Sequence, residues 1–228
     1  MSTFRQFFPS KANTIARATI VTGLLTVVAL GGLGTAMYRS PFVTQVGTAR
    51  EQVVPFSHRH HVGGLGIDCR YCHTSVEESS FAGIPPTETC MTCHSQVWTG
   101  AAMLQPVRDS WLNDEPLEWT RVHDTPDFVF FDHSIHINKG MGCTECHGQV
   151  DEMPLTWKEN TMHMQWCLEC HRAPEKHIRP KDAVFDMHWD PDNYKETEGK
   201  ERSEFGPELV EAYNIKTMQL QNCSICHR

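Results

Sequence analysis

All ten cysteines of this 228-residue chain fall, without remainder, in five copies of one pattern, Cys-x-x-Cys-His. Two thiols at positions i and i+3 lie on one face of a helical turn, and the histidine that follows projects from the end of the same turn. Each copy therefore presents two sulfurs and one imidazole to a common object. Numbered in chain order, motifs 1 to 5 are Cys69–His73, Cys90–His94, Cys143–His147, Cys167–His171 and Cys223–His227.

This pattern is the attachment signature of c-type haem. The two thiols bond the vinyl groups on one edge of a haem, and the histidine binds the iron as proximal ligand. The sequence therefore predicts five covalent haem c groups. The predicted attachment residues are Cys69, Cys72, Cys90, Cys93, Cys143, Cys146, Cys167, Cys170, Cys223 and Cys226, and the predicted proximal iron ligands are His73, His94, His147, His171 and His227.

Other uses of paired cysteines explain the pattern less well. Zinc sites combine two such pairs, or one pair with two histidines, around each metal, and do not require a histidine after every pair. Thioredoxin-like motifs occur singly near a βαβ pattern, which this sequence lacks. Disulfides would leave the five trailing histidines unexplained.

The number of predicted haems sets the expected fold. Hydrophobic residues make up 39% of the chain, which is low for a globular protein. Five haems in about 190 residues must lie near one another and form much of the core. We predict a multihaem cytochrome c fold, mostly loop with short α-helices wrapped around haems and one N-terminal transmembrane helix. Each motif should occupy a short helix, the six tryptophans should pack against the haems, and a further helix should run from Pro207 to Leu220.

The N-terminal region predicts a membrane anchor. Residues 19–38 contain no charged side chain, and about 20 apolar residues span a bilayer as a helix. Arg5, Lys11 and Arg17 precede this run, and the first acid is Glu51, so the N-terminus should be cytoplasmic. A cleaved signal peptide would have a shorter apolar region and an A-x-A-like site. We predict a cytoplasmic N-terminus and single-pass inner-membrane anchor over residues 1–40 and an exported, periplasmic haem domain over residues 41–228.

The haem domain is acidic. Residues 39–228 carry 17 Lys and Arg against 28 Asp and Glu. Such a surface does not suit nucleic acid. It suits attraction of a basic electron-carrier protein, and it serves solubility equally well.

An internal repeat organises this domain. The first cysteines of successive motifs are 21, 53, 24 and 56 residues apart. The pattern Phe-x-His-x-x-His stands before motif 1, at residues 56–61, and again before motif 3, at residues 131–136. The sequence thus predicts two two-haem modules, at about residues 54–100 and 129–175, and a terminal haem within residues 207–228.

The repeat also suggests the distal iron ligands. Nine histidines lie outside the motifs, and low-spin haems of electron carriers need a second axial ligand, commonly His or Met. The repeat resembles the small three- and four-haem cytochromes c of anaerobic bacteria, in which such a pair serves two haems. That resemblance implies His58, His61, His133 and His136 as distal ligands. For the fifth haem we predict His123, with His163 as the alternative.

Several longer segments resemble the pentahaem cytochrome subunit of alternative complex III, a bacterial quinol:electron-acceptor oxidoreductase. The resemblance covers nearly the whole chain, and the Val122-His123-Asp124 element is part of what selects His123. The segments that carry it are residues 54–73, 122–136, 164–172 and 209–228.

The resemblance implies a non-catalytic electron-transfer subunit of a membrane complex. Its partners would be an iron–sulfur subunit, polytopic quinol-binding subunits, a monohaem cytochrome and a soluble acceptor such as cytochrome c, a copper protein or a terminal oxidase. Two alternatives remain. A multihaem reductase of the pentahaem kind uses a Lys in place of one motif histidine, whereas all five motifs here end in His. In a stand-alone membrane-anchored quinol dehydrogenase the first motif follows the anchor closely, whereas 30 residues separate Tyr38 from Cys69.

Overall fold

The computed structural model describes residues 7–227, except for the side chains of residues 196 and 197. Residues 1–6 of the predicted N-terminal segment, with Arg5, and the C-terminal Arg228 lie outside the described part. The chain forms two compact units, of which the first ends at Gln45 and the second begins at Val46. The observed division thus falls five residues after the predicted boundary at residue 40.

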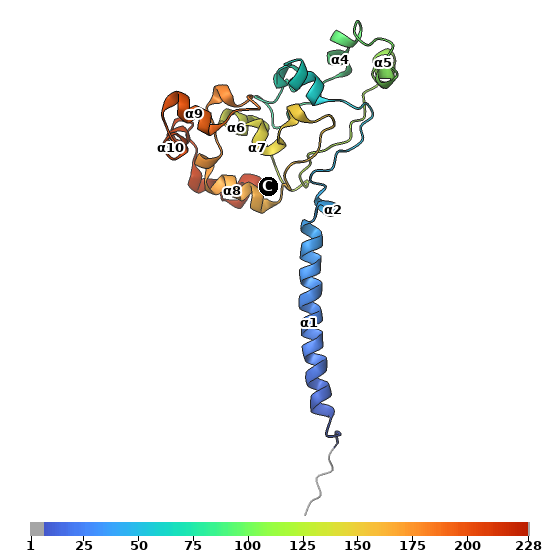
Figure 1. Cartoon of the computed structure of the whole chain (residues 1–228), viewed down its shortest axis with the longest axis vertical. Coiled ribbons are helices and arrows are strands. Elements are labelled where there is room, and N and C mark those ends of the chain that lie inside the picture. Colours follow the sequence, from blue (N-terminus) through green and yellow to red (C-terminus); the bar gives the residue numbers. More distant parts are fainter. Residues whose placement is uncertain (1–6, 228) are drawn as a thin grey trace, which may run out of the picture. The chain divides into compact units, whose positions relative to one another are not determined.

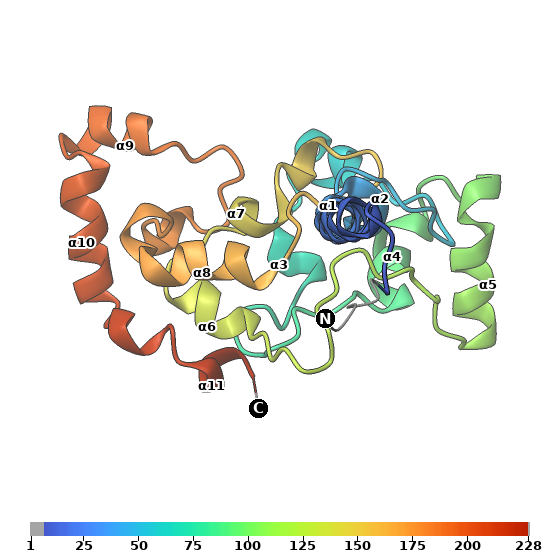
Figure 2. The same ribbon diagram turned by 90° about the horizontal axis from the view of Figure 1, so that it is seen from below.

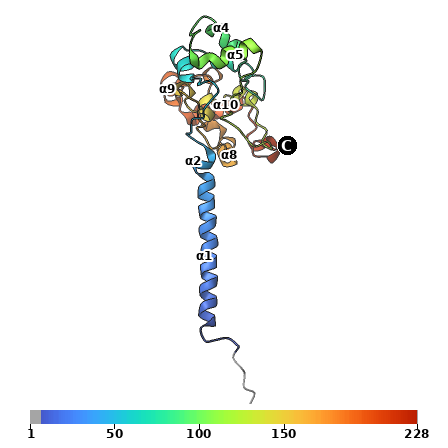
Figure 3. The same ribbon diagram turned by 90° about the vertical axis from the view of Figure 1, so that its right-hand side faces the viewer.

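The first unit consists of α1 (Ala12–Arg39) and the short α2 (Pro41–Thr44). Helix α1 is one continuous rod (Figures 1 and 3). Its 28 residues rise through about 42 Å, its mean hydropathy in the most apolar window is 1.9, and none of that window is buried. Three threonine hydroxyls inside it donate to carbonyl oxygens four residues earlier, which satisfies them without water. Helix α1 is therefore long and apolar enough to cross a membrane.

The second unit is built from short helices joined by loops (Figure 2). Over its described residues the only β-pairing is two isolated bridges. This architecture confirms the predicted fold class. Its α-helices are α3 (Cys69–Cys72), α4 (Thr87–His94), α5 (Gln105–Asn113), α6 (His133–Asn138), α7 (Cys143–His147), α8 (Met164–Arg172), α9 (Pro191–Glu198), α10 (Arg202–Ala212) and α11 (Cys223–Cys226), with a π-helix η1 (Arg59–Gly64) and the 3₁₀ turns η2 (Ala102–Leu104), η3 (Val150–Glu152), η4 (Pro174–Lys176), η5 (Lys181–Ala183) and η6 (Thr217–Gln219).

Each Cys-x-x-Cys-His motif lies on its own short helix, namely α3, α4, α7, α8 and α11. Helix α3 shows how such a turn is stabilised. The side chain of Asp68 accepts from the backbone N–H of Arg70, which satisfies one of the free donors at the start of the helix. A helical turn places the two sulfurs of a motif on one side, as the attachment chemistry requires.

The polypeptide buries few apolar side chains. Nine are buried among the described residues, whereas interiors of ordinary domains this size contain many more. One small cluster joins Val54, Leu104 and Val107, with Cys90 and Met91 of motif 2 packed against it. The motifs and their cofactors therefore must contribute much of the packing.

The predicted helix from Pro207 to Leu220 is wrong at both ends. Helix α10 begins at Arg202, where Glu201 and Glu204 form a reciprocal capping box. Because this box satisfies the first free N–H groups, it starts the helix before Pro207, which lies inside it. The helix ends at Ala212, and Asn214 has a φ of 52°, a left-handed conformation that does not continue a helix.

The charged stretch before α10 forms helix α9 where a loop was expected. Asp190 caps α9 by accepting from the N–H of Asp192, and Pro191 occupies the first helical position. Gly199 ends the helix with a φ of 71°, which glycine adopts without a steric penalty. These terminal signals define a helix in a sequence of low hydrophobicity.

Candidate haem sites

The structure places four motif histidines opposite the four histidines of the Phe-x-His-x-x-His repeats. Each pairing joins one predicted proximal ligand to one predicted distal ligand. The ring centroids are 6.5 Å apart for His58 and His73, 6.3 Å for His61 and His94, 6.3 Å for His133 and His147, and 6.2 Å for His136 and His171.

This spacing suits two imidazoles bound to opposite faces of one iron. A metal–imidazole bond is about 2 Å long, and the bonded nitrogen lies about 1.1 Å from the ring centroid. Two axial imidazoles therefore have centroids roughly 6.3 Å apart. All four pairs fall within 0.2 Å of that value. The ring positions thus fit four haem irons, each held between one motif histidine and one repeat histidine.

The proximal rings present the correct nitrogen to a metal. The Nδ1 atom of His73 lies 2.7 Å from the carbonyl oxygen of Gly83, and that of His171 lies 2.9 Å from Leu220 O. A carbonyl oxygen only accepts, so Nδ1 carries the proton and Nε2 keeps its lone pair. Similar contacts join His94 to Val97 O at 3.1 Å and His227 to Phe128 O at 3.1 Å.

The distal rings follow the same rule. The Nδ1 atoms of His61, His133 and His136 lie 2.8, 2.9 and 2.6 Å from the carbonyl oxygens of Ser57, Ser80 and Asp132. His58 differs, because its Nδ1 lies 3.0 Å from the Thr156 hydroxyl, which can donate or accept. In the three carbonyl-bound rings Nε2 is thus left free for iron.

Burial favours the neutral form of two of these rings, those of His147 and His58. Burial, followed by neighbouring His123 and His133, lowers the pKa of His147 to about 3. Burial, followed by His73 and His61, lowers the pKa of His58 to about 4. A neutral imidazole is the form that binds a metal. The chain therefore keeps His147 and His58 in the neutral form at physiological pH.

The phenylalanine of each repeat holds the two histidines apart. Phe56 stacks on His61 with centroids 4.5 Å apart and meets His58 edge-on at 4.9 Å. Phe131 stacks on His136 at 4.5 Å and meets His133 edge-on at 4.7 Å. Sequence reasoning noted the shared phenylalanine but did not assign it this role. The sequence repeat is thus a repeat of one three-ring arrangement.

His123 lies elsewhere than the predicted pairing with the fifth motif would require. Its ring centroid is 4.3 Å from that of His147, with the planes at 73°. The ring of His147 already lies opposite His133. The ring recorded against His227 in the described part of the chain is Phe128, at 5.9 Å. His123 is half-buried, its buried Nε2 has no hydrogen-bond partner in the described part of the chain, and burial lowers its pKa to about 4.

The alternative fifth ligand, His163, sits at a helix end. It is the residue before α8, and its side chain is half-buried. The backbone N–H of His163 contacts the hydroxyl of Thr161. His163 thus lies directly N-terminal to the helix that carries motif 4.

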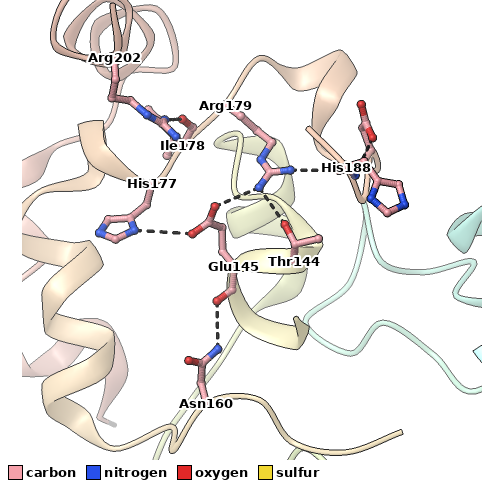
Figure 4. A network of polar contacts seen from close by, with 9 residues as sticks. Thr144, Glu145, Asn160, His177, Ile178, Arg179, His188 and Arg202 are labelled. Atoms are coloured by element: carbon pink, nitrogen blue, oxygen red, sulfur yellow. Dashed lines mark hydrogen bonds and ion pairs between the residues drawn. The ribbon is translucent and has the colours of Figure 1, made fainter. Parts of the chain in front are cut away.

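A polar network fixes motif 3 beside the segment that follows motif 4 (Figure 4). The buried Arg179 donates from Nη2 to Glu145 Oε1 at 3.0 Å and to the Thr144 hydroxyl at 2.9 Å, and from Nη1 to Asp186 O at 3.1 Å. His177 Nδ1 lies 3.7 Å from Glu145 Oε2. Burial acts to raise the pKa of Glu145, but the bonds from His177 and Arg179 outweigh it and lower that pKa.

Replacing Arg179 by methionine should loosen motif 3. The variant leaves the partly buried Glu145 carboxylate without its closest cation, and removing one partner of a buried pair costs about 3–5 kcal/mol. Because Glu145 keeps 27% of its side chain exposed, we expect about 2–3 kcal/mol. Thermal unfolding of the haem-loaded protein measures this loss.

The matched control for that substitution is Arg121→Met. The ion pair of Arg121 with Asp124 spans 3.0 Å, but both side chains are more than 60% exposed. Exposed pairs contribute about 0–1 kcal/mol. Equal losses of stability in the two variants would show that the Arg179 network does not hold motif 3.

The described residues hold no group of three or more His, Cys, Asp or Glu side chains arranged around a metal ion. None of the ten cysteines is joined to another in a disulfide, which leaves each pair to bond the vinyl groups of a haem. The donor set fits haem attachment, with two sulfurs and one imidazole at each motif and a second imidazole near the motif histidine at motifs 1 to 4.

Comparisons with known proteins agree with this geometry. Residues 129–228 match the family model described as cytochrome c7 and related cytochrome c. The chain is 31% identical over 163 residues to the menaquinone reductase multihaem cytochrome c subunit of Nitratidesulfovibrio vulgaris. The match covers 61% of this chain and 77% of that protein. With its motif helices and facing imidazoles, the chain belongs to the multihaem cytochrome c family, whose members carry haem c and transfer electrons.

Proposed function

We propose that this protein is the membrane-anchored pentahaem subunit of a quinol-oxidising complex, and that it relays electrons through five haem c groups to a periplasmic acceptor. The observation that carries the proposal is the set of four imidazole pairs with centroids 6.2–6.5 Å apart. An iron held between two imidazoles has no open position for substrate. Each such site can only change its oxidation state.

Bound haems supply reversible one-electron chemistry, and the chain adjusts the reduction potential of each haem. Carbonyl acceptors on Nδ1 make an imidazole a stronger donor to iron, which favours the ferric state. His61, His133 and His136 have such acceptors, whereas His58 has the Thr156 hydroxyl. We therefore expect motif 1, which faces His58, to hold a haem of different potential from its neighbours.

For the fifth haem we keep His123 as the proposed distal ligand. What supports it is the buried Nε2 without a partner, since an uncompensated buried nitrogen costs free energy unless something binds it. The ring of His123 lies beside His147, so the assignment to the fifth haem rests on this nitrogen and on the Val122-His123-Asp124 element, not on a ring that faces His227.

Replacing His123 by alanine should then turn one low-spin haem into a high-spin haem, because its sixth position is lost. Electron paramagnetic resonance of the oxidised protein measures the change. The control is His60→Ala, since His60 is exposed and lies between the two repeat histidines. A high-spin haem in His163→Ala, with none in His123→Ala, would assign the ligand to His163 instead.

Helix α1 supports the proposed location. We infer that it anchors the protein in the inner membrane with the haem domain on the periplasmic side, because its flanking cations favour a cytoplasmic N-terminus. The relative from Nitratidesulfovibrio vulgaris is one subunit of a menaquinone reductase. That supports assembly with other subunits, which we propose include an iron–sulfur subunit, polytopic quinol-binding subunits and a monohaem cytochrome.

Purification in mild detergent tests the proposal. We expect the protein to co-purify with other membrane subunits, and the isolated chain to accept electrons from dithionite but not from quinol. Quinol oxidation by the chain alone would instead establish a stand-alone quinol dehydrogenase.

The relative's name also favours a second candidate, in which electrons run toward menaquinone. The intact complex distinguishes the directions. Reduction of the haems by added menaquinol supports quinol oxidation. Reduction of menaquinone by a complex supplied with a reduced cytochrome, without the reverse reaction, supports the second candidate.

A further inference from the structure

Motifs 1 and 2 lie side by side. The hydroxyl of Tyr71, inside motif 1, is 2.9 Å from that of Thr92, inside motif 2. The histidines that face these motifs, His58 and His61, come from the same turn of chain. On its other side, α4 packs on α5, where the Thr87 and Ser110 hydroxyls are 2.6 Å apart. Motif 2 therefore lies between motif 1 and α5.

Motif 1, rather than motif 2, is the neighbour of motif 3. Thr156, nine residues after His147, binds Nδ1 of His58, which faces motif 1. In return Ser80, seven residues after His73, binds Nδ1 of His133, which faces motif 3. Each of these two motifs thus supplies the segment that orients the distal ligand of the other.

Two backbone hydrogen bonds also join the segments of motifs 1 and 3. The N–H of Arg59 donates to Met153 O at 3.0 Å, and the N–H of Ser134 donates to Ser79 O at 3.1 Å. The segments of motifs 1 and 3 therefore lie against each other.

Motif 4 is the second neighbour of motif 3, after motif 1. The facing histidines, His133 and His136, share helix α6. The side-chain amide of Asn160, seven residues before Cys167, donates to the carbonyl oxygens of Glu145 and Cys146 at 3.2 Å each. The start of the motif 4 segment thus lies against the end of motif 3.

Motif 5 follows motif 4. Nδ1 of His171 lies 2.9 Å from the carbonyl oxygen of Leu220, three residues before motif 5. The proximal ligand of motif 4 is thus oriented by the segment that leads into motif 5.

From these contacts we propose that the five haem sites lie in the spatial order 2, 1, 3, 4, 5, with motif 2 at one end of the relay. Figure 2 shows α4, α3, α7 and α8 following one another across the haem domain in that order. The chain order therefore reverses within the first module only. The inference deepens the proposed relay, because it makes motif 2 a terminal site and the passage between motifs 1 and 3 the joint between modules.

Site-specific spin labels test this order in the haem-loaded, full-length protein. Because haem attachment uses all ten native cysteines, an introduced cysteine is the one free thiol. One label goes on Leu112→Cys, 77% exposed on α5 next to motif 2, and another on Met218→Cys, 86% exposed on η6 near motif 5.

Four distal substitutions then mark the haems one at a time. They are His61→Met, His58→Met, His133→Met and His136→Met, for motifs 2, 1, 3 and 4. Methionine in place of histidine raises the potential of the haem it binds, so the marked haem is reduced first and becomes diamagnetic. The readout is the fall in nitroxide relaxation rate at that potential, and haem staining with mass measurement confirms that all haems remain attached.

The proposed order predicts opposite ranks for the two labels. The fall in the relaxation rate of the nitroxide at residue 112 should be largest for His61→Met, then His58→Met, His133→Met and His136→Met. The fall at residue 218 should follow the reverse rank, with several-fold differences between the first and last variants. A larger response at residue 112 to His133→Met than to His58→Met would overturn the order. The measurement needs neither quinol nor partner subunits, so the order and the proposed function can fail separately.

Discussion

Replacing His133 by alanine should create a haem that binds carbon monoxide in a protein that otherwise binds none. His133 faces His147 at 6.3 Å with the ring planes 9° apart, so the substitution removes one of two axial ligands. A reduced iron with an open sixth position binds carbon monoxide, whereas one closed by two imidazoles does not. We expect about one carbon monoxide per chain, measured by difference absorbance of the reduced protein.

The control for this experiment is His60→Ala, which should bind no carbon monoxide. His60 stacks near Trp98, with centroids 5.9 Å apart, and does not face a motif histidine among the described contacts. Stoichiometric binding by the unsubstituted protein would contradict closed ligation at every site and would favour the multihaem reductase reading. Absence of binding in His133→Ala would show that another residue, such as the adjacent His123, takes the vacated position.

Removing both attachment cysteines of motif 3, as Cys143→Ala with Cys146→Ala, should unfold much of the haem domain. Motif 3 contacts the segments of motifs 1 and 4, and the polypeptide buries only nine apolar side chains over its described residues. A loss of about 5 kcal/mol or more would lower the Tm by roughly 10–20 °C in a domain this size. Thermal unfolding followed by circular dichroism, together with the yield of haem-stained protein, measures the effect.

The matched variant removes the cysteines of motif 5, as Cys223→Ala with Cys226→Ala. Motif 5 ends the chain, and its helix α11 spans four residues. Its loss should leave the first four sites folded and attached to haem. Similar Tm losses in the two double variants would show that the position of a motif in the domain does not determine its contribution to stability.

The haem chemistry was predictable because its signals are local. A thioether pair and its histidine require fixed spacing within one helical turn, so Cys69–His73 and its four counterparts are recognisable from sequence alone. The repeats at His58 and His133 are visible for the same reason. Family membership, the short-helix fold and haem c follow from these residues and agree with the comparisons.

Long-range contacts were not predictable in this way. Nothing in the spacing of His58 and Thr156, 98 residues apart, indicates that one orients the other. Arg179 and Glu145 are 34 residues apart, and their pairing depends on the chain returning to motif 3 after motif 4. The start of α10 was missed for another reason, because the prediction began the helix at Pro207, whereas the capping residues Glu201 and Glu204 start it at Arg202.

The exchange of segments between motifs 1 and 3 has a consequence for biogenesis. Thr156, which follows motif 3, holds Nδ1 of His58, and Ser80, which follows motif 1, holds Nδ1 of His133. The distal ligand that faces motif 1 is therefore not held in place until the chain has been made beyond residue 156. We expect the two sites to gain their complete set of ligands together, whichever motif receives its haem first.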